Sequence, residues 1–142
     1  MMYALSNTTK IKTNRQLGLH QSYWEGLWEV LRRLERGEFE YRGGGEYTLR
    51  KDVLGFSMAE FFIPAFSTCG AVGCMSGWAS FFASGTCKRD FREHLDNASA
   101  SQRIQHRMLV APYGYDETPE DFPPERCAPV LRRYLETGEV HW

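Results

Sequence analysis

The sequence lacks an excess of charge of either sign, and it lacks any long hydrophobic run. Its 17 lysines and arginines nearly balance its 18 aspartates and glutamates, so the formal net charge is -1. Such a chain has no overall electrostatic attraction to nucleic acid or to an anionic membrane surface. No segment approaches the roughly 20 apolar residues that a membrane-spanning helix needs. We therefore expect neither a nucleic acid nor a membrane as the partner.

Residues 1–15 lack the apolar core of a secretory signal peptide. We therefore expect a cytoplasmic protein, whose four cysteines would be reduced thiols rather than a disulfide framework. The chain also lacks internal repeats and low-complexity linkers. Its 142 residues suffice for one ordinary domain. We place this single globular domain at residues 14–142, behind an N-terminal arm at residues 1–13.

Amphipathic helical patterns are what the sequence does have. From Thr13 or Asn14, apolar residues recur at spacings of three, four and seven until Gly37, a natural helix stop. This stripe consists of Leu17, Trp24, Leu27, Trp28, Leu31 and Leu34. We expect one helix of about six turns whose stripe faces the core. Further helices are expected from residue 69 to Gly85, over residues 101–110, and from Pro124 to Gly138.

A short β-hairpin is expected between the first two long helices. Phe39 and Tyr41 alternate with glutamates, a run of glycines follows at 43–45, and Tyr47 and Leu49 alternate again. Alternating apolar residues on either side of a glycine turn are typical of two paired strands. The glycine run lacks the Lys-Ser/Thr of a phosphate-binding loop. The predicted fold class is therefore mainly α, a compact single-domain fold of about four to five helices with one short β-hairpin.

Residues 69–79, CGAVGCMSGWA, combine two cysteines, three glycines and a tryptophan next to an apolar run. One interpretation is catalytic, because a helix N-terminus stabilises a cysteine thiolate and lowers its pKa. Cys74 would then be the nucleophile, and His106 the base, of a cysteine-dependent hydrolase. A papain-like nucleophile lies in a similar stretch, but Cys74 precedes Trp78 by four residues rather than one. The pattern around the histidine is also helical rather than strand-like.

A second interpretation of this stretch is a metal site. Cys69 and Cys74 are close enough in sequence to chelate zinc together. A structural zinc site needs four ligands, and the chain has no second close pair of cysteines or histidines. The zinc-binding module therefore stays an alternative.

A third interpretation is close packing of a helix. Gly70, Gly73 and Gly77 recur at intervals of three and four, which places them on one face of a helix. Glycine in a helix interior costs about 1 kcal/mol relative to alanine, so three of them need a structural reason. We favour this interpretation, in which the cysteine is a small buried side chain. The structural motif would consist of Cys69, Gly70, Gly73, Cys74, Gly77 and Trp78.

Four motifs of the chain recur together in one group of proteins. They are Phe56 with Met58, residues 69–79, MLVAP at 108–112, and TGEVHW at 137–142. In these motifs the chain resembles a widespread group of small uncharacterised bacterial, prophage and phage proteins. It departs from the group at Ala71, where the group has threonine, and at Val110, where the group has an aromatic residue. The resemblance implies a small, mostly helical fold in a mobile-element setting and no established activity, so it assigns no catalytic residue.

Our leading hypothesis is a non-enzymatic phage or prophage accessory protein that binds a host or phage protein. Inhibition of a host defence system such as CRISPR interference would be one outcome of such binding. No cofactor is expected, and the oligomeric state is not predicted. Tyrosines beside acidic residues are good interface anchors, so the loop after residue 112 is the candidate surface. Its candidate partner-binding residues are Tyr113, Tyr115, Asp116, Glu117, Glu120 and Asp121.

Three other functions remain as alternatives. The first is the cysteine-dependent hydrolase that uses Cys74 and His106, and the second is the small zinc-binding module. The third is a DNA-binding module that would rely on local basic residues despite the balanced net charge. Its candidate residues are Lys88, Arg89, Arg92, Arg132 and Arg133.

Overall fold

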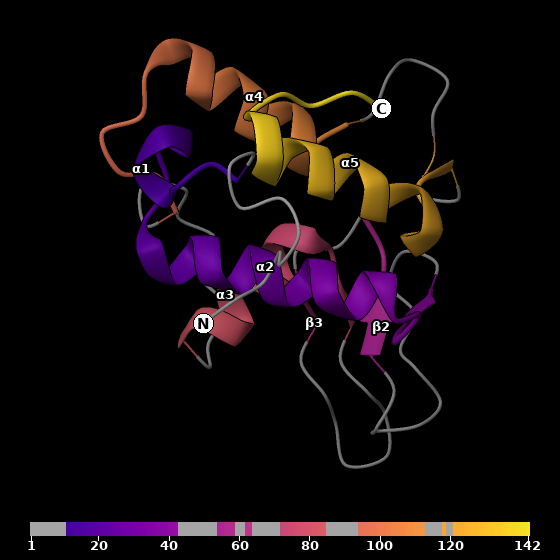
Figure 1. Ribbon diagram of the computed structural model, residues 1–142. Coiled ribbons are helices and arrows are strands. Elements are labelled where there is room, and N and C mark those ends of the chain that lie inside the picture. Colours follow the sequence, from indigo (N-terminus) through magenta and orange to yellow (C-terminus); the bar gives the residue numbers. More distant parts are fainter. Residues whose placement is uncertain are drawn as a thin grey trace.

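The computed structural model describes residues 11–42, 54–58, 62–63, 72–84, 94–112, 118 and 121–142. Its helices are α1 (Asn14–Leu17), α2 (Gln21–Glu35), α3 (Met75–Ser84), α4 (Ala100–Val110) and α5 (Pro124–Thr137). Its strands are β1 (Phe39–Tyr41), β2 (Leu54–Phe56), β3 (Phe62–Ile63) and β4 (Val72–Gly73). This architecture confirms the prediction of a compact, mainly α fold (Figure 1). No helix in the described segments has the length and apolar character needed to cross a membrane.

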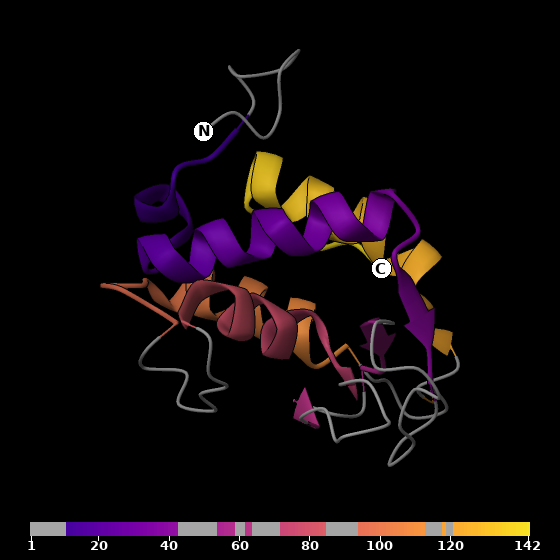
Figure 2. The same cartoon turned by 90° about the horizontal axis from the view of Figure 1, so that it is seen from below.

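Helix α2 lies at the centre of the fold, with α5 packed on one side and α3 on another (Figure 2). The reason is the apolar stripe read from the sequence, which gives α2 a continuous face to bury. Five members of the stripe are buried in the core, namely Leu17, Leu27, Trp28, Leu31 and Leu34. Trp24 is partly buried and packs against them. The predicted core face of the first helical segment is therefore confirmed.

The predicted single first helix is wrong, because it is interrupted at residues 18–20. Thr13 caps α1 by accepting a hydrogen bond from the backbone N–H of Gln16. Gly18 then adopts a left-handed conformation with a φ of 72°, and a Cβ there would lie only 2.8 Å from the Cβ of Ala98. Leu19 forms an antiparallel bridge with Leu95 before α2 begins. Glycine is the residue that fits both the φ and the close contact.

The predicted helix from residue 69 is also wrong, because α3 begins only at Met75. Val72 and Gly73 form strand β4 instead, so only Gly77 of the three glycines lies in a described helix. Close helix contact does exist, but Gly26 of α2 provides it. A Cβ at Gly26 would lie 2.1 Å from the carbonyl oxygen of Ala79 on α3, which is closer than real Cβ contacts. The close approach of the two backbones therefore depends on a glycine of α2 and not on the glycines of the cysteine segment.

The short strands form one sheet in the order β1-β2-β4-β3. Strand β1 confirms the first half of the predicted hairpin, but its described partner β2 runs parallel to it. Residues 47–49, the predicted second strand, lie outside the described residues. Packing on α3 helps to position the two strands: the indole N–H of Trp78 donates to the carbonyl of Gly55 at 2.7 Å, and the ring of Phe39 lies 5.6 Å from that of Trp78.

The C-terminal segment closes the fold by lying along α4 (Figure 1). Gly138 ends α5 in a left-handed conformation with a φ of 80°. The backbone N–H of Val140 then donates to the side-chain oxygen of Gln105 at 2.7 Å. The indole N–H of Trp142 donates to the carbonyl of Met108, also at 2.7 Å. The terminal TG…W motif thus connects the end of α5 to α4 through hydrogen bonds.

Candidate functional site

Cys74 directly precedes α3 and acts as its cap. Its Sγ accepts a hydrogen bond from the backbone N–H of Gly77 at 3.4 Å, and the residue is only 5% exposed. The backbone N–H of Trp78 donates to the carbonyl of Cys74 at 3.0 Å. The sulfur therefore satisfies one of the N–H groups that a helix start leaves unpaired. This is an architectural contact at the start of α3.

His106 belongs to a buried polar network that joins three helices. Its Nε2 lies 2.8 Å from the hydroxyl oxygen of Tyr23 on α2. The same hydroxyl lies 2.9 Å from the Oγ of Ser76 on α3. The ring of His94 stacks on Tyr23, with ring centres 4.1 Å apart and planes 7° from parallel. All four side chains are at most 2% exposed.

Burial keeps His106 and Tyr23 of this network uncharged at neutral pH. Burial, with a smaller contribution from the nearby His94, lowers the pKa of His106 to about 3. Burial also raises the pKa of Tyr23 well above its ordinary value. An imidazole with so low a pKa is a weak base. Among the described residues, His106 bonds to the phenol hydroxyl of Tyr23, and the Cys74 sulfur accepts from the backbone N–H of Gly77. This geometry favours a structural role for both residues.

The metal alternative can be followed only in part among the described residues. Cys69 lies outside the described residues. Within the described segments, no group of three or more His, Cys, Asp or Glu side chains could hold a metal ion. Cys74 and Cys127 are both buried free thiols. Burial raises the pKa of the Cys127 thiol to about 12, which makes it a poor thiolate ligand at neutral pH.

Most of the predicted partner-binding loop lies outside the described residues, namely Tyr113, Tyr115, Asp116, Glu117 and Glu120. Asp121 is exposed, and its carboxylate accepts a hydrogen bond from the backbone N–H of Thr118 at 2.8 Å. Its carbonyl accepts a hydrogen bond from Arg126 at 2.6 Å. These contacts hold the start of α5 in place, and the predicted surface around Asp121 stays a prediction.

Of the basic residues considered for DNA binding, only Arg132 and Arg133 belong to the part of the chain that the structure describes. Lys88, Arg89 and Arg92 lie outside the described residues, and so does the region that joins them. Arg132 forms a bidentate ion pair with Glu35, with both N–O distances 2.7 Å. A further ion pair at 3.4 Å links it to Glu136. Its positive charge is therefore compensated within the chain.

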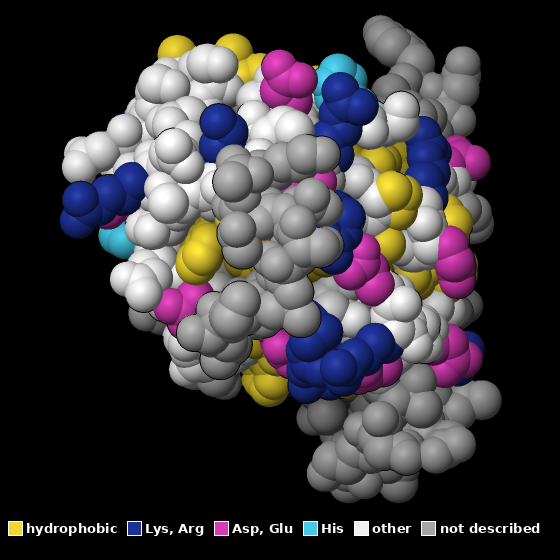
Figure 3. Space-filling view, viewed as in Figure 1, with side chains coloured by type: hydrophobic (Ala, Val, Ile, Leu, Met, Phe, Trp, Pro, Cys, Tyr) yellow, Lys and Arg dark blue, Asp and Glu magenta, His cyan; other side chains and the backbone are white. Residues whose placement is uncertain are grey.

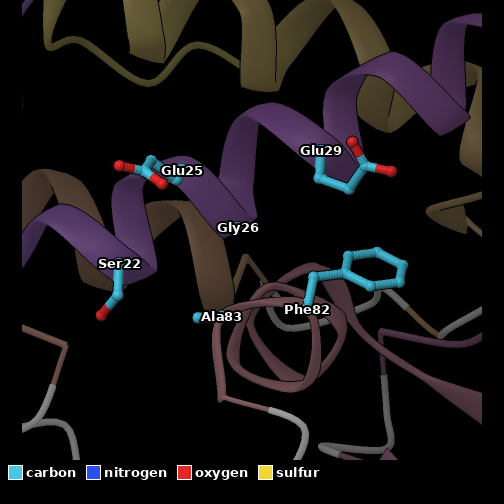
Figure 4. A pocket seen from close by; sticks show the side chains of 6 residues that line it. All are labelled: Ser22, Glu25, Gly26, Glu29, Phe82 and Ala83. Carbon is cyan, nitrogen blue, oxygen red and sulfur yellow. The ribbon is translucent and has the colours of Figure 1, made fainter. Parts of the chain in front are cut away.

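A groove of about 300 Å³ separates part of α2 from α3, and we call it the α2–α3 groove. Its walls come from Ser22, Glu25, Gly26, Glu29, Phe82 and Ala83. Figure 4 shows the two glutamates on α2 and the ring of Phe82 on α3 below them. Hydrogen bonds from Arg32 and Arg33 lower the pKa of Glu29. The acidic wall of the groove is thus partly neutralised by the chain's own arginines.

A second cavity, of about 370 Å³, lies beside α4, and we call it the α4 cavity. It is lined by Leu95, Arg103, His106, Arg107, Val110 and Ala111. Arg103 donates to the carbonyl of Ala98 at 3.3 Å. Throughout the part of the chain that the structure describes, neither Arg103 nor Arg107 has a carboxylate partner. The cavity therefore combines apolar walls with two positive charges that no described carboxylate neutralises.

The outer face of α4 carries two exposed apolar side chains, which we call the α4 ridge. Ile104 is 56% exposed and Met108 is 41% exposed. They lie one helical turn apart, and Figure 3 shows hydrophobic side chains at the upper edge of the molecule, where α4 lies in Figure 1. Sequence reasoning predicted the helix but missed this surface. The signal available in the sequence was the helical spacing, which places both residues away from the face that contains His106 and Leu109, the buried residues of α4.

Comparisons of the chain with protein-family models, with curated proteins and with solved structures found no match. The resemblance to phage and prophage proteins therefore stays a prediction.

Proposed function

We propose that the chain is non-enzymatic and acts by binding another protein through the α4 ridge. The observation that supports this proposal is the exposure of Ile104 and Met108 side by side. Among the described residues, Phe81 is the only other large hydrophobic side chain classed as exposed, at 36%. Isolated exposed apolar residues are common on protein surfaces, but adjacent large ones favour an interface.

The charges around the ridge indicate the chemistry of the partner. Helix α4 contains Arg103 and Arg107 but no acidic residue. Arginine and methionine are enriched in protein interfaces, whereas lysine and glutamate are depleted. A surface that presents an apolar spot beside carboxylates would complement this face. The resemblance favours a host or phage protein, and inhibition of a host defence system such as CRISPR interference is the specific form that we propose.

A site-specific crosslinking experiment tests the proposal. A photoreactive phenylalanine analogue is placed at position 104, and at position 133 on α5 as the control. Arg133 is exposed and belongs to a different helix. We expect position 104 to capture one protein in the native host that position 133 does not capture. Identical capture from both positions would contradict the proposal.

Purified proteins then supply the quantitative test. Replacing both ridge residues, as Ile104→Glu with Met108→Glu, should weaken binding of the captured protein by about thirtyfold or more, as loss of an interface hot spot does. The charge-changing control Arg133→Glu should leave the affinity within about twofold. Equal effects of the two changes would show that the ridge is not the contact surface.

A further inference from the structure

The α4 cavity has apolar walls that protein binding through the ridge does not use, although both proposals involve Arg103 and Arg107. We propose that it binds a small organic anion, with a carboxylate or phosphate head between Arg103 and Arg107 and an apolar body inside the cavity. Neither Ile104 nor Met108 lines this cavity. The two proposals share the arginines but use different apolar surfaces, so either proposal can fail alone.

The size and the walls of the cavity fit a small molecule. Its volume of about 370 Å³ lies within the range of known ligand pockets, roughly 300 to 1,000 Å³. Leu95, Val110 and Ala111 supply apolar surface for the body of the ligand. The antiparallel bridge between Leu95 and Leu19 holds one wall in place. A preformed cavity of this kind needs little reorganisation when a ligand enters.

The two arginines supply the charge that would select an anion. Arg103 and Arg107 are four residues apart on α4, so their side chains lie on the same face of the helix. Arginine binds carboxylates and phosphates through paired, charge-assisted hydrogen bonds. Elsewhere in the described chain, Arg32 and Arg132 already have carboxylate partners. Within the same described segments, Arg103 and Arg107 have no carboxylate partner. An incoming oxyanion would therefore not have to displace one.

His106 supplies a neutral inner surface rather than charge. Its Nε2 is already engaged by Tyr23, and burial lowers the pKa of the imidazole to about 3. The positive charge of the cavity therefore comes from the two guanidinium groups rather than from the imidazole. Selection between ligands would then depend on the charge of the head group.

Titration of the purified full chain with matched probes tests the inference. Phenylacetate is compared with the uncharged phenylacetamide, and phenyl phosphate with phenol, by calorimetry at neutral pH. We expect one anion or both to bind at least about tenfold more tightly than the uncharged counterpart. The two arms distinguish a carboxylate site from a phosphate site. Equal affinity for charged and uncharged probes, or no anion binding at about 10 mM, would overturn the inference.

Three variants locate the binding within the molecule. Arg107→Gln should weaken anion binding about tenfold, whereas Arg133→Gln, which removes an equal charge from α5, should not. Ala111→Phe should block binding by filling the cavity, and Ala111 is exposed, so the new ring does not enter the core. Circular dichroism confirms that each variant is folded. Equal affinities for Arg107→Gln and Arg133→Gln would show that the anion binds elsewhere.

Discussion

The α2–α3 groove and the α4 cavity have similar volumes, about 300 Å³ and 370 Å³, but they differ in how their charges are balanced. In the groove, Glu29 is held by two arginines of its own helix. Glu25 accepts a hydrogen bond from the side chain of Gln21 at 3.0 Å. In the α4 cavity, the two arginines have no carboxylate partner within the described segments. We therefore expect different functions for the two sites despite their similar volumes.

The two sites also differ in what creates them. The groove borders the close approach of Gly26 to Ala79, so it lies beside a contact on which the fold depends. The α4 cavity borders His106, which the polar network ties to α2 and α3. We interpret the groove as a consequence of helix packing and the cavity as a binding site. The predictions below test this distinction, from the largest expected effect to the smallest.

Gly26→Ala tests whether the groove borders an essential contact. The added Cβ would meet the backbone carbonyl of Ala79 at 2.1 Å, so α2 and α3 must move apart. We expect a loss of about 3 kcal/mol in the free energy of unfolding, at the upper end of overpacking effects. Urea denaturation measures it. Ser22→Ala, at an exposed position of the same helix, should change stability by less than about 0.5 kcal/mol, and similar losses in both variants would contradict the account.

Tyr23→Phe tests the network beside the α4 cavity. The change removes a hydroxyl that lies within hydrogen-bond distance of both Ser76 and His106. Because a polar group that loses its partner in the core is costly, we expect a loss of about 2 kcal/mol. Tyr134 is a matched control, since it is equally buried and its hydroxyl has no hydrogen-bond partner in the described part of the chain. Tyr134→Phe should be nearly neutral, and equal losses would argue against the network.

The pH dependence of stability tests the burial of His106. Its pKa in the folded state is lowered to about 3, so between that value and about 6.5 the unfolded chain binds the proton more readily. Stability should therefore fall as the pH drops below about 6.5, by about 2 kcal/mol at pH 5 from this residue alone. Urea denaturation at pH 7 and pH 5 should show a smaller fall for His106→Gln. The same fall in both proteins would show that His106 is not buried uncharged.

Glu29→Gln gives the smallest expected effect and sharpens the contrast between the two sites. It removes the ion pairs to Arg32 and Arg33 at the rim of the groove. Because partly exposed pairs contribute little, we expect a loss below about 1 kcal/mol in unfolding experiments. The affinity for phenylacetate should stay the same. A change in that affinity would link the groove to anion binding and contradict the distinction drawn above.

The elements that could be predicted from the sequence are those with local signals. The apolar spacing of α2 predicts its buried face, and α4 (Ala100–Val110) closely follows the helix predicted over residues 101–110. Pro124 in the first turn and Gly138 at the end predict the bounds of α5. Each of these signals acts within a few residues of the helix that it defines, so no knowledge of the fold is required.

The features that could not be predicted depend on residues far apart in the chain. The hydroxyl of Tyr23 contacts His106, which lies 83 positions later in the chain. Position 26 requires glycine because the backbone of Ala79, on another helix, leaves no room for a Cβ. The start of α3 was misplaced because Gly73 pairs with Phe56 in the sheet, an interaction that the glycine spacing does not reveal. For the α4 cavity, the available signal was a helix with two arginines and no acidic residue. That pattern indicates an unbalanced face but not the cavity beside it.

The most direct test is a residue-resolved NMR titration of the full chain with phenylacetate. The account predicts that backbone amide shifts change at residues 103–111 and at Leu95, which line or border the α4 cavity. It predicts no change at Glu25, Gly26, Glu29, Phe82 and Ala83, which line the α2–α3 groove. Shifts centred on the groove, or spread evenly over the molecule, would contradict the claim that the α4 cavity is the binding site.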